Sequence, residues 1–191
     1  MPAVYNFFVG NKVLSGMAKR ILGFAKKRSL PKVYKTTLRR WARKNLSELN
    51  PTNPIKTVCL FTDEFTNYND TNIGIEAIQL LTALNYRVEL PAHSLSGRTY
   101  LSKGLLRKAR KIAIMNIEML SAMIDEDTQL LGIEPSAILG FRDEFPDLVP
   151  APMFEKAEKL ASNALLIDEF ISAEFKRGNI SSDSFKILSI F

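Results

Sequence analysis

The chain has 191 residues, of which 46% are hydrophobic, a composition that excludes wholesale disorder and suits one folded domain with an appendage. Its net charge of +6 is unevenly divided, because residues 1–56 hold thirteen Lys and Arg against one acid, whereas residues 57–191 hold thirteen against nineteen. The single cysteine, Cys59, excludes an internal disulfide framework and a four-thiolate metal site. A reducing, cytoplasmic setting suits this cysteine usage best.

The first 54 residues are predicted to form a basic helical connector. Apolar residues recur every three or four positions from Val13 to Phe24 with Lys and Arg between them, which predicts a basic amphipathic helix. Pro31 breaks this pattern, and a second short helix is expected over residues 36–46. The sequence "NPTNP" (50–54) is a strong loop signal. We therefore expect a connector over residues 1–54 and an α/β domain over residues 55–191.

Apolar runs and helical spacings alternate through the rest of the chain. The short apolar runs predict strands over residues 56–63, 86–90, 129–133 and 184–191. Helices are expected over 71–85, 100–124 and 134–145, with one or two more over 153–178. Such alternation predicts a Rossmann-like parallel sheet of about four strands with flanking helices. Because the last strand would be cut at Phe191, we expect the chain to be a piece of a longer protein.

Three loops follow the first three predicted strands, over residues 62–70, 91–98 and 134–144. In open α/β sheets ligands collect beyond the carboxyl ends of the strands, so these loops should converge. They contain no cysteine and no phosphate-binding glycine motif, and we assign no catalytic and no metal-binding residue. The candidate pocket residues are Asp63, His93, Gly97, Arg98, Glu134, Ser136 and Arg142.

The second loop, "PAHSLSGR", has two interpretations. Gly97 and the helix that follows could present backbone N–H groups to an anion, with Arg98 beside them. Alternatively, Ser94, Ser96 and Thr99 cap that helix and Gly97 makes the turn, which is the favoured interpretation.

Charged groups in the three loops also offer partners for one another. Glu134 is expected to pair with Arg98 or Arg142 and so to hold the loops together. A metal or acid–base pairing of His93 with Asp63 or Glu64 is disfavoured, because a metal site needs three or four well-placed donors.

The three loops carry a resemblance to a known family. From Thr57 to Val149, the segments "LFTDEFTNYND", "SGRTYLSKGLLRKARKIA" and "GIEPSAILGFRDEFPDLV" resemble the cysteine-rich CCG domain of flavin-linked and iron–sulfur oxidoreductases. That family includes the iron–sulfur subunit of glycolate oxidase, an anaerobic glycerol-3-phosphate dehydrogenase subunit and a heterodisulfide reductase subunit. The segment "RSLPK" looks like the connector that follows a ferredoxin-like domain, and "FKILSIF" looks like the start of a second repeat.

The resemblance implies a cluster-binding domain that has lost its ligands. The cysteines of the family fall on Glu64, Leu95, Ser96 and Ala137, none of which offers sulfur. Hard oxygen donors do not replace the thiolates that hold an iron–sulfur cluster. By this resemblance the chain binds no cofactor itself, and FAD and 4Fe–4S clusters are expected elsewhere in the parent protein.

Three functions are compatible with these observations. The resemblance implies a region of an electron-transferring flavin/iron–sulfur oxidoreductase that acts on a 2-hydroxy acid such as lactate or glycolate. The region would be a scaffold that docks on the flavin domain, the ferredoxin-like domain and a second CCG repeat, and would not be catalytic alone. The alternative is a binding module whose basic helix engages the inner face of a membrane or, less well, nucleic acid. Against this module, the favoured interpretation of the helix is that its apolar face packs on the domain or on a missing neighbouring region. A third hypothesis is an independent enzyme with a hard metal at Asp63, Glu64 and His93.

Overall fold

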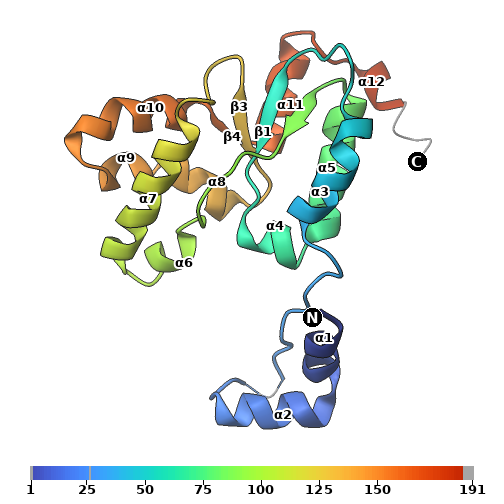
Figure 1. The fold of residues 1–191 in the computed structure, drawn as a ribbon, viewed down its shortest axis with the longest axis vertical. Helices are drawn as coiled ribbons and strands as arrows, with labels where there is room; N and C mark the ends of the chain where they lie inside the picture. The colour runs from blue at the N-terminus through green and yellow to red at the C-terminus, as the bar shows by residue number, and fades with distance from the viewer. Residues whose placement is uncertain (1, 26, 187–191) are drawn as a thin grey trace.

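A four-stranded parallel sheet covered by helices forms the body of the protein, and two short N-terminal helices, α1 (Pro2–Gly10) and α2 (Lys12–Ile21), project from it (Figure 1). This computed structural model describes residues 2–25 and 27–186. The predicted α/β class, with a parallel sheet of about four strands, is confirmed. Within the described residues no helix combines the length and the apolar character that crossing a bilayer requires.

The strands follow the order β2-β1-β3-β4. Val58 of β1 pairs with Val88 of β2 and with Gln129 of β3, and all three pairings in the sheet are parallel. Because the chain runs from β1 outward to β2 and then returns to the other side of β1, the strand order reverses between β1 and β3. Their bounds are β1 Thr57–Leu60, β2 Arg87–Glu89, β3 Gln129–Gly132 and β4 Ala164–Leu166.

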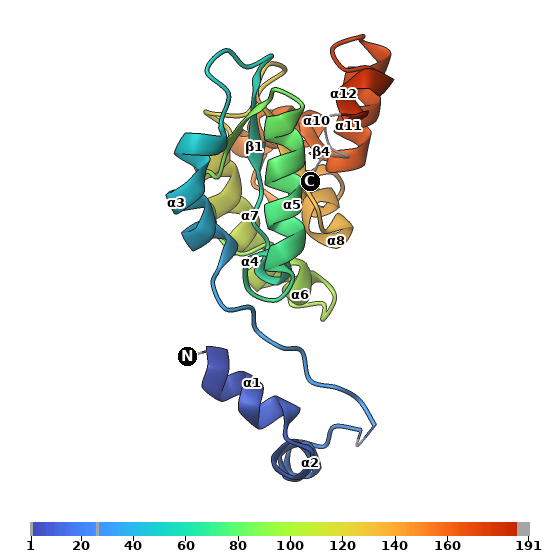
Figure 2. The same ribbon diagram turned by 90° about the vertical axis from the view of Figure 1, so that its right-hand side faces the viewer.

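Helices cover both faces of the sheet, as Figures 1 and 2 show. On one face α3 (Leu38–Leu49), α5 (Thr71–Ala83) and α11 (Ile167–Lys176) enclose a core that includes Val58 and Leu60. The other face is covered by α7 (Leu106–Leu120), α8 (Pro135–Arg142) and α10 (Phe154–Ser162), which pack on Cys59. Successive residues of β1 thus enter opposite cores, as the alternation of a strand requires. The remaining helices are α1 Pro2–Gly10, α2 Lys12–Ile21, α4 Glu64–Tyr68, α6 Arg98–Leu101, α9 Phe145–Leu148, the 3₁₀ turn η1 Ala151–Met153, and α12 Ser182–Lys186.

Two of the predicted elements differ from the structure. The fourth strand was expected over residues 184–191, but residues 182–186 form α12 and the rest of that segment lies outside the described residues. The fourth strand is instead β4, a three-residue strand between α10 and α11. The single helix expected over residues 100–124 is divided into α6 and α7, because Gly104 has a φ of +67° that a continuous helix cannot accommodate.

The third helix belongs to the packed body. Leu38 and Ala42 of α3 are 0% and 1% exposed in the core beside α5. A methyl group added at Gly74 of α5 would lie 2.4 Å from the Leu38 Cδ2 atom, so the absence of a side chain there permits the close approach of the two helices. A domain boundary at residue 54 stays a prediction.

A buried carboxylate ties α11 to the amino-terminal side of the sheet. Glu174 is fully buried and accepts hydrogen bonds from Lys56 at 3.1 Å, Tyr86 at 2.8 Å, Arg177 at 2.7 Å and Asn179 at 2.8 Å. Burial acts to raise the pKa of Glu174, but these four hydrogen bonds outweigh it and lower the pKa to about 2. The carboxylate is therefore charged in the folded state.

Candidate functional site

The loops after β1 and β2 meet at the carboxyl edge of the sheet, where Glu64 contacts Ser96. The Glu64 Oε1 atom accepts from the Ser96 backbone N–H at 2.9 Å, and Oε2 accepts from the Ser96 hydroxyl at 2.7 Å. Ser96 is only 2% exposed, so the carboxylate satisfies polar groups that water reaches poorly. Glu64 and Ser96, two positions that the resemblance assigns to cluster cysteines, are thus joined directly by hydrogen bonds to the Glu64 carboxylate.

Arg98 joins the loop after β2 to the loop after β3. Its guanidinium donates to Glu134 at 2.7 Å and to the Ser136 hydroxyl at 2.5 Å, and it lies 4.5 Å from the centre of the Phe65 ring. These contacts confirm both the expected convergence of the three loops and the pairing of Glu134 with Arg98. Arg142 lies elsewhere, where it forms an ion pair with Glu169 at 2.7 Å.

His93 is half-buried in the loop as a neutral side chain. Its Nε2 atom accepts from the Thr62 backbone N–H at 3.1 Å, so Nδ1 carries the proton and donates to the Ser94 carbonyl at 2.6 Å. The ring also packs against Phe61 with 4.1 Å between centroids. Burial is the main cause that lowers the pKa of His93, to about 4. Both ring nitrogens are therefore committed to the loop.

Asp63 has a structural role at the start of α4. Its Oδ1 atom accepts from the backbone N–H groups of Phe65 at 2.8 Å and Thr66 at 3.2 Å, and its other oxygen accepts from the Thr66 hydroxyl. The described residues contain no cluster of three or more His, Cys, Asp or Glu side chains that could hold a metal ion. The structure gives no support to a hard-metal site at Asp63, Glu64 and His93, because the three side chains have separate partners.

Several expectations about the second loop are corrected. Ser96 bonds to Glu64 and caps no helix, and the residue before α6 is Gly97, which provides no side-chain cap. Gly97 does make the turn, with a φ of +78°. Of the other assigned ligand positions, Leu95 is 50% exposed, and Ala137 lies on the side of α8 that is buried in the core.

Two residues that hold the site were not identified from the sequence. Asn116 of α7 is fully buried, accepts from the Ser94 N–H at 2.8 Å and donates to the Leu95 carbonyl at 2.8 Å. Arg39 of α3 donates to the Pro91 carbonyl at 2.8 Å. The sequence did carry a signal for Asn116, because an amide side chain in the apolar stripe of a helix indicates a buried hydrogen-bonding role. No local sequence pattern indicated the contact of Arg39.

The donor set at this edge does not suit an iron–sulfur cluster. Glu64 and Ser96 offer oxygen, and Leu95 and Ala137 offer no donor at all. Cys59, the sole cysteine of the chain, points into the core from the middle of β1. Burial, with the nearby Glu89 charge, raises the pKa of its thiol to about 11, so it is not a thiolate at neutral pH.

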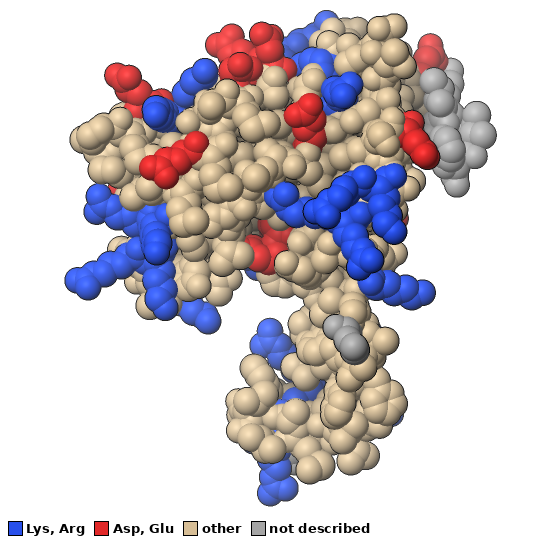
Figure 3. All heavy atoms as spheres, viewed as in Figure 1, with Lys and Arg blue, Asp and Glu red and all other residues tan. Residues whose placement is uncertain are grey.

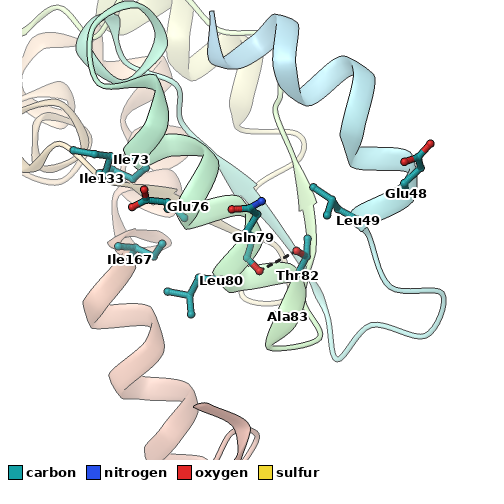
Figure 4. A pocket seen from close by; sticks show the side chains of 11 residues that line it. Glu48, Leu49, Ile73, Glu76, Gln79, Leu80, Thr82, Ala83, Ile133 and Ile167 are labelled. Carbon is teal, nitrogen blue, oxygen red and sulfur yellow. Dashed lines mark hydrogen bonds between the residues drawn. The ribbon is translucent and has the colours of Figure 1, made fainter. Parts of the chain in front are cut away.

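A separate apolar groove of about 690 Å³ runs along the outer side of α5, between the end of α3 and the start of α11 (Figure 4). None of the candidate pocket residues lines it. The sequence signal for this groove was that α5 carries apolar residues on the side that faces away from the core as well as on the buried side. One of these residues, Ile73, is 45% exposed in the structure. The groove is lined by Glu48, Leu49, Ile73, Glu76, Ala77, Gln79, Leu80, Thr82, Ala83, Ile133 and Ile167.

Comparison with curated proteins relates this chain to parts of larger enzymes. It is 22% identical over 192 residues to D-2-hydroxyglutarate dehydrogenase of Escherichia coli, an alignment that covers 96% of the chain and 18% of the enzyme. The corresponding enzyme of Pseudomonas putida is 29% identical over 75% of the chain and 15% of its own length. One subunit of the E. coli anaerobic glycerol-3-phosphate dehydrogenase is 28% identical over 64% of the chain and 31% of its own length. The chain is similar to regions of dehydrogenases.

The extent of these matches limits what they say. The chain spans less than a third of each of these three relatives. The alignment with the E. coli D-2-hydroxyglutarate dehydrogenase includes most of the basic N-terminal segment as well as the body, because it covers nearly the whole chain. No family model and no solved structure gives a significant match.

Proposed function

We propose that this chain is a non-catalytic scaffold region of a multidomain oxidoreductase. In this region, side chains that hydrogen-bond to one another replace the ligands of a former cluster site. The observation that carries the proposal is the contact between Glu64 and Ser96, whose oxygens lie where the resemblance places cysteines. The ion pair of Arg98 with Glu134 supports it, because it joins the third loop to the second. In this proposal the protein itself connects the loops that a cluster would otherwise bridge.

The relatives support a 2-hydroxy acid as the substrate of the whole enzyme. Four of them are named D-2-hydroxyglutarate dehydrogenase, and an electron-transferring oxidoreductase of this kind takes its electrons from such an acid. FAD and 4Fe–4S clusters would lie on other regions of the parent protein, as the resemblance to the CCG domain implies. This chain would position those regions and would not carry electrons.

The groove on α5 supports a docking role for this scaffold. Its apolar lining, with Leu80 and Ile167 among it, suits another region of the same dehydrogenase, since more than two thirds of each relative lies outside the match. When this chain and the remainder of the enzyme are produced as separate polypeptides, a Leu80→Lys variant should lose co-purification with that remainder. Met123→Lys, at a residue that is 41% exposed and does not line the groove, is the control. Equal co-purification of both variants would contradict docking at this groove.

The cluster-site proposal is tested by anaerobic reconstitution with ferrous iron and sulfide. The wild-type chain should take up neither and should lack the broad visible absorbance of a cluster. A variant that restores sulfur at all four positions should take up both; its substitutions are Glu64→Cys, Leu95→Cys, Ser96→Cys and Ala137→Cys. Stoichiometric uptake by the wild type would contradict the proposal, as would a folded variant, checked by circular dichroism, that takes up no iron.

The non-catalytic role has a direct assay. The purified wild-type chain, given D-2-hydroxyglutarate and an artificial electron acceptor, should show no acceptor reduction above a protein-free blank. The described residues contain no cluster of His, Cys, Asp or Glu that could hold a metal ion, and the proposed scaffold role assigns the hydrogen bonds of the candidate pocket to holding the loops, so we expect no turnover from it. Reduction that scales with the concentration of the chain would overturn this role.

A further inference from the structure

The two crossed helices α1 and α2, which we call the hairpin for brevity, carry apolar side chains on their outer surface. In α2, Val13, Met17 and Ile21 follow one another at four-residue spacing and are 71%, 61% and 81% exposed. Ser15 and Lys19, on another side of the helix, are buried. This distribution is the reverse of that in a helix that packs on a core. The stripe therefore faces outward, away from the rest of the chain that the structure describes.

The first helix extends this apolar surface. It contains no charged residue, and Tyr5, Phe7 and Phe8 are 42%, 64% and 53% exposed. Its polar side chain, Asn6, is instead used internally, since it exchanges hydrogen bonds of 2.7 and 2.9 Å with the backbone of Val33. Exposed aromatic and aliphatic side chains on a short helix are typical of segments that lie in the lipid–water interface.

The surroundings of the hairpin are strongly basic. Residues 1–47 contain no acid at all. On the body, the turn after α6 and the start of α7 present an exposed basic cluster whose members form no ion pair with the described residues. Figure 3 shows Lys and Arg gathered there, on the side of the body from which the hairpin extends. The basic cluster consists of Lys103, Arg107, Lys108, Arg110 and Lys111.

Contacts of the linker place the hairpin at the carboxyl edge of the sheet. The Tyr34 N–H donates to the Tyr68 carbonyl at 2.7 Å, and the Asn69 side chain donates to the Lys32 carbonyl at 2.6 Å. Tyr68 and Asn69 belong to the loop after β1, and α7 begins beyond the loop after β2. The hairpin and the basic cluster thus extend from the same edge (Figures 1 and 3).

We propose that the hairpin and the basic cluster bind the surface of an anionic lipid bilayer. The apolar stripe would enter the boundary between headgroups and acyl chains, while Lys and Arg contact the lipid phosphates. The ten residues of α2 are about 15 Å long, half of the hydrocarbon thickness of ~30 Å, so the hairpin lies in the interface and does not span it.

Charge and exposure together favour a lipid surface over other partners. Nucleic acid would engage the basic cluster but would leave the stripe of Val13, Met17 and Ile21 in water. A protein partner would have to offer an apolar surface beside an acidic one to match the stripe and the lack of acids in the first 47 residues. An anionic bilayer accounts for both features through one surface.

The test is co-sedimentation of the full chain with vesicles of phosphatidylcholine alone and with vesicles that also contain phosphatidylglycerol. Binding should require the anionic lipid and should weaken as salt is raised, because the lipid charges are screened. The double variant Arg107→Gln/Lys108→Gln should bind about thirtyfold more weakly, from about 1 kcal/mol for each basic residue near the surface. Lys156→Gln/Lys159→Gln on α10 is the matched charge control and should bind as the wild type does.

The apolar stripe has its own variant and control. Met17→Ser/Ile21→Ser should reduce binding at least tenfold, and it leaves the body intact because both side chains are exposed. Met123→Ser/Phe175→Ser removes apolar side chains of 41% and 48% exposure from the body and should bind normally. No binding to anionic vesicles at low salt overturns the proposal in favour of a protein partner. If binding to anionic vesicles is unchanged in the stripe variant but weaker in the basic variant, insertion of the stripe is overturned, because attraction to the lipid charges alone then explains the binding.

Discussion

Removal of the Glu64 carboxylate should separate the loops after β1 and β2 at a measurable cost in stability. The substitution Glu64→Ala deletes two charge-assisted hydrogen bonds, of 2.9 and 2.7 Å, to Ser96. Each such bond stabilises by about 1.5–3 kcal/mol, and Ser96, which is 2% exposed, would be left poorly satisfied. Glu64 is half-buried, so entering water offsets part of this loss. We expect the free energy of unfolding to fall by about 2–3 kcal/mol.

Urea denaturation followed by circular dichroism measures this change, and the midpoint of thermal unfolding should fall by about 5–10 °C for a domain of this size. Ser96→Ala removes one of the two bonds and should cost about 1 kcal/mol. Glu64→Gln keeps an oxygen for the Ser96 N–H and should lie between the wild type and Glu64→Ala. A Glu64→Ala chain within about 0.5 kcal/mol of the wild type would refute the reasoning.

Three further substitutions or conditions test the packing and the buried charges. Gly132→Ala places a Cβ atom 2.3 Å from the Ile138 Cβ atom, and overpacking should lower the free energy of unfolding by about 2 kcal/mol, measured by urea denaturation. The pKa of His93 is lowered to about 4 in the folded protein, whereas in the unfolded chain the imidazole has its ordinary pKa of 6.5. Between these two pH values the unfolded chain therefore binds one more proton than the folded protein does. Stability should therefore fall by about 2 kcal/mol from pH 7 to pH 5, and this loss should be absent in His93→Gln. Glu174→Leu leaves Lys56 without its buried ion-pair partner and should lower the free energy of unfolding by about 3–5 kcal/mol in the same denaturation assay. A decrease of under about 1 kcal/mol would contradict a stabilising role for the hydrogen bonds to Glu174.

The main strands could be predicted because their apolar runs are short and bounded by polar residues. The strand β4 could not, since Ala164, Leu165 and Leu166 lie between two helical sequences whose periodicity runs on across them. The division of α6 from α7 did carry a local signal, because Gly104 stands in a helical pattern where it costs about 1 kcal/mol relative to Ala.

The candidate site was predictable in place but not in detail. Loops that follow parallel strands share one edge of the sheet, so their convergence follows from the strands alone. The partner of Glu64 is 32 residues away in the sequence, and the choice of Ser96 depends on the angle at which Gly97 turns the chain. Arg39 is 52 residues from the carbonyl that it contacts, and no spacing rule connects the two.

The central claim is that the loops at the carboxyl edge are joined by protein oxygens where the resemblance places a cluster. A crystal structure of the anaerobically purified chain, with anomalous data collected at the iron absorption edge, tests it most directly. We predict no iron peak between the three loops, and Glu64 within hydrogen-bonding distance of Ser96. An iron peak at that place, or a Glu64 side chain that lies apart from Ser96, would contradict the account.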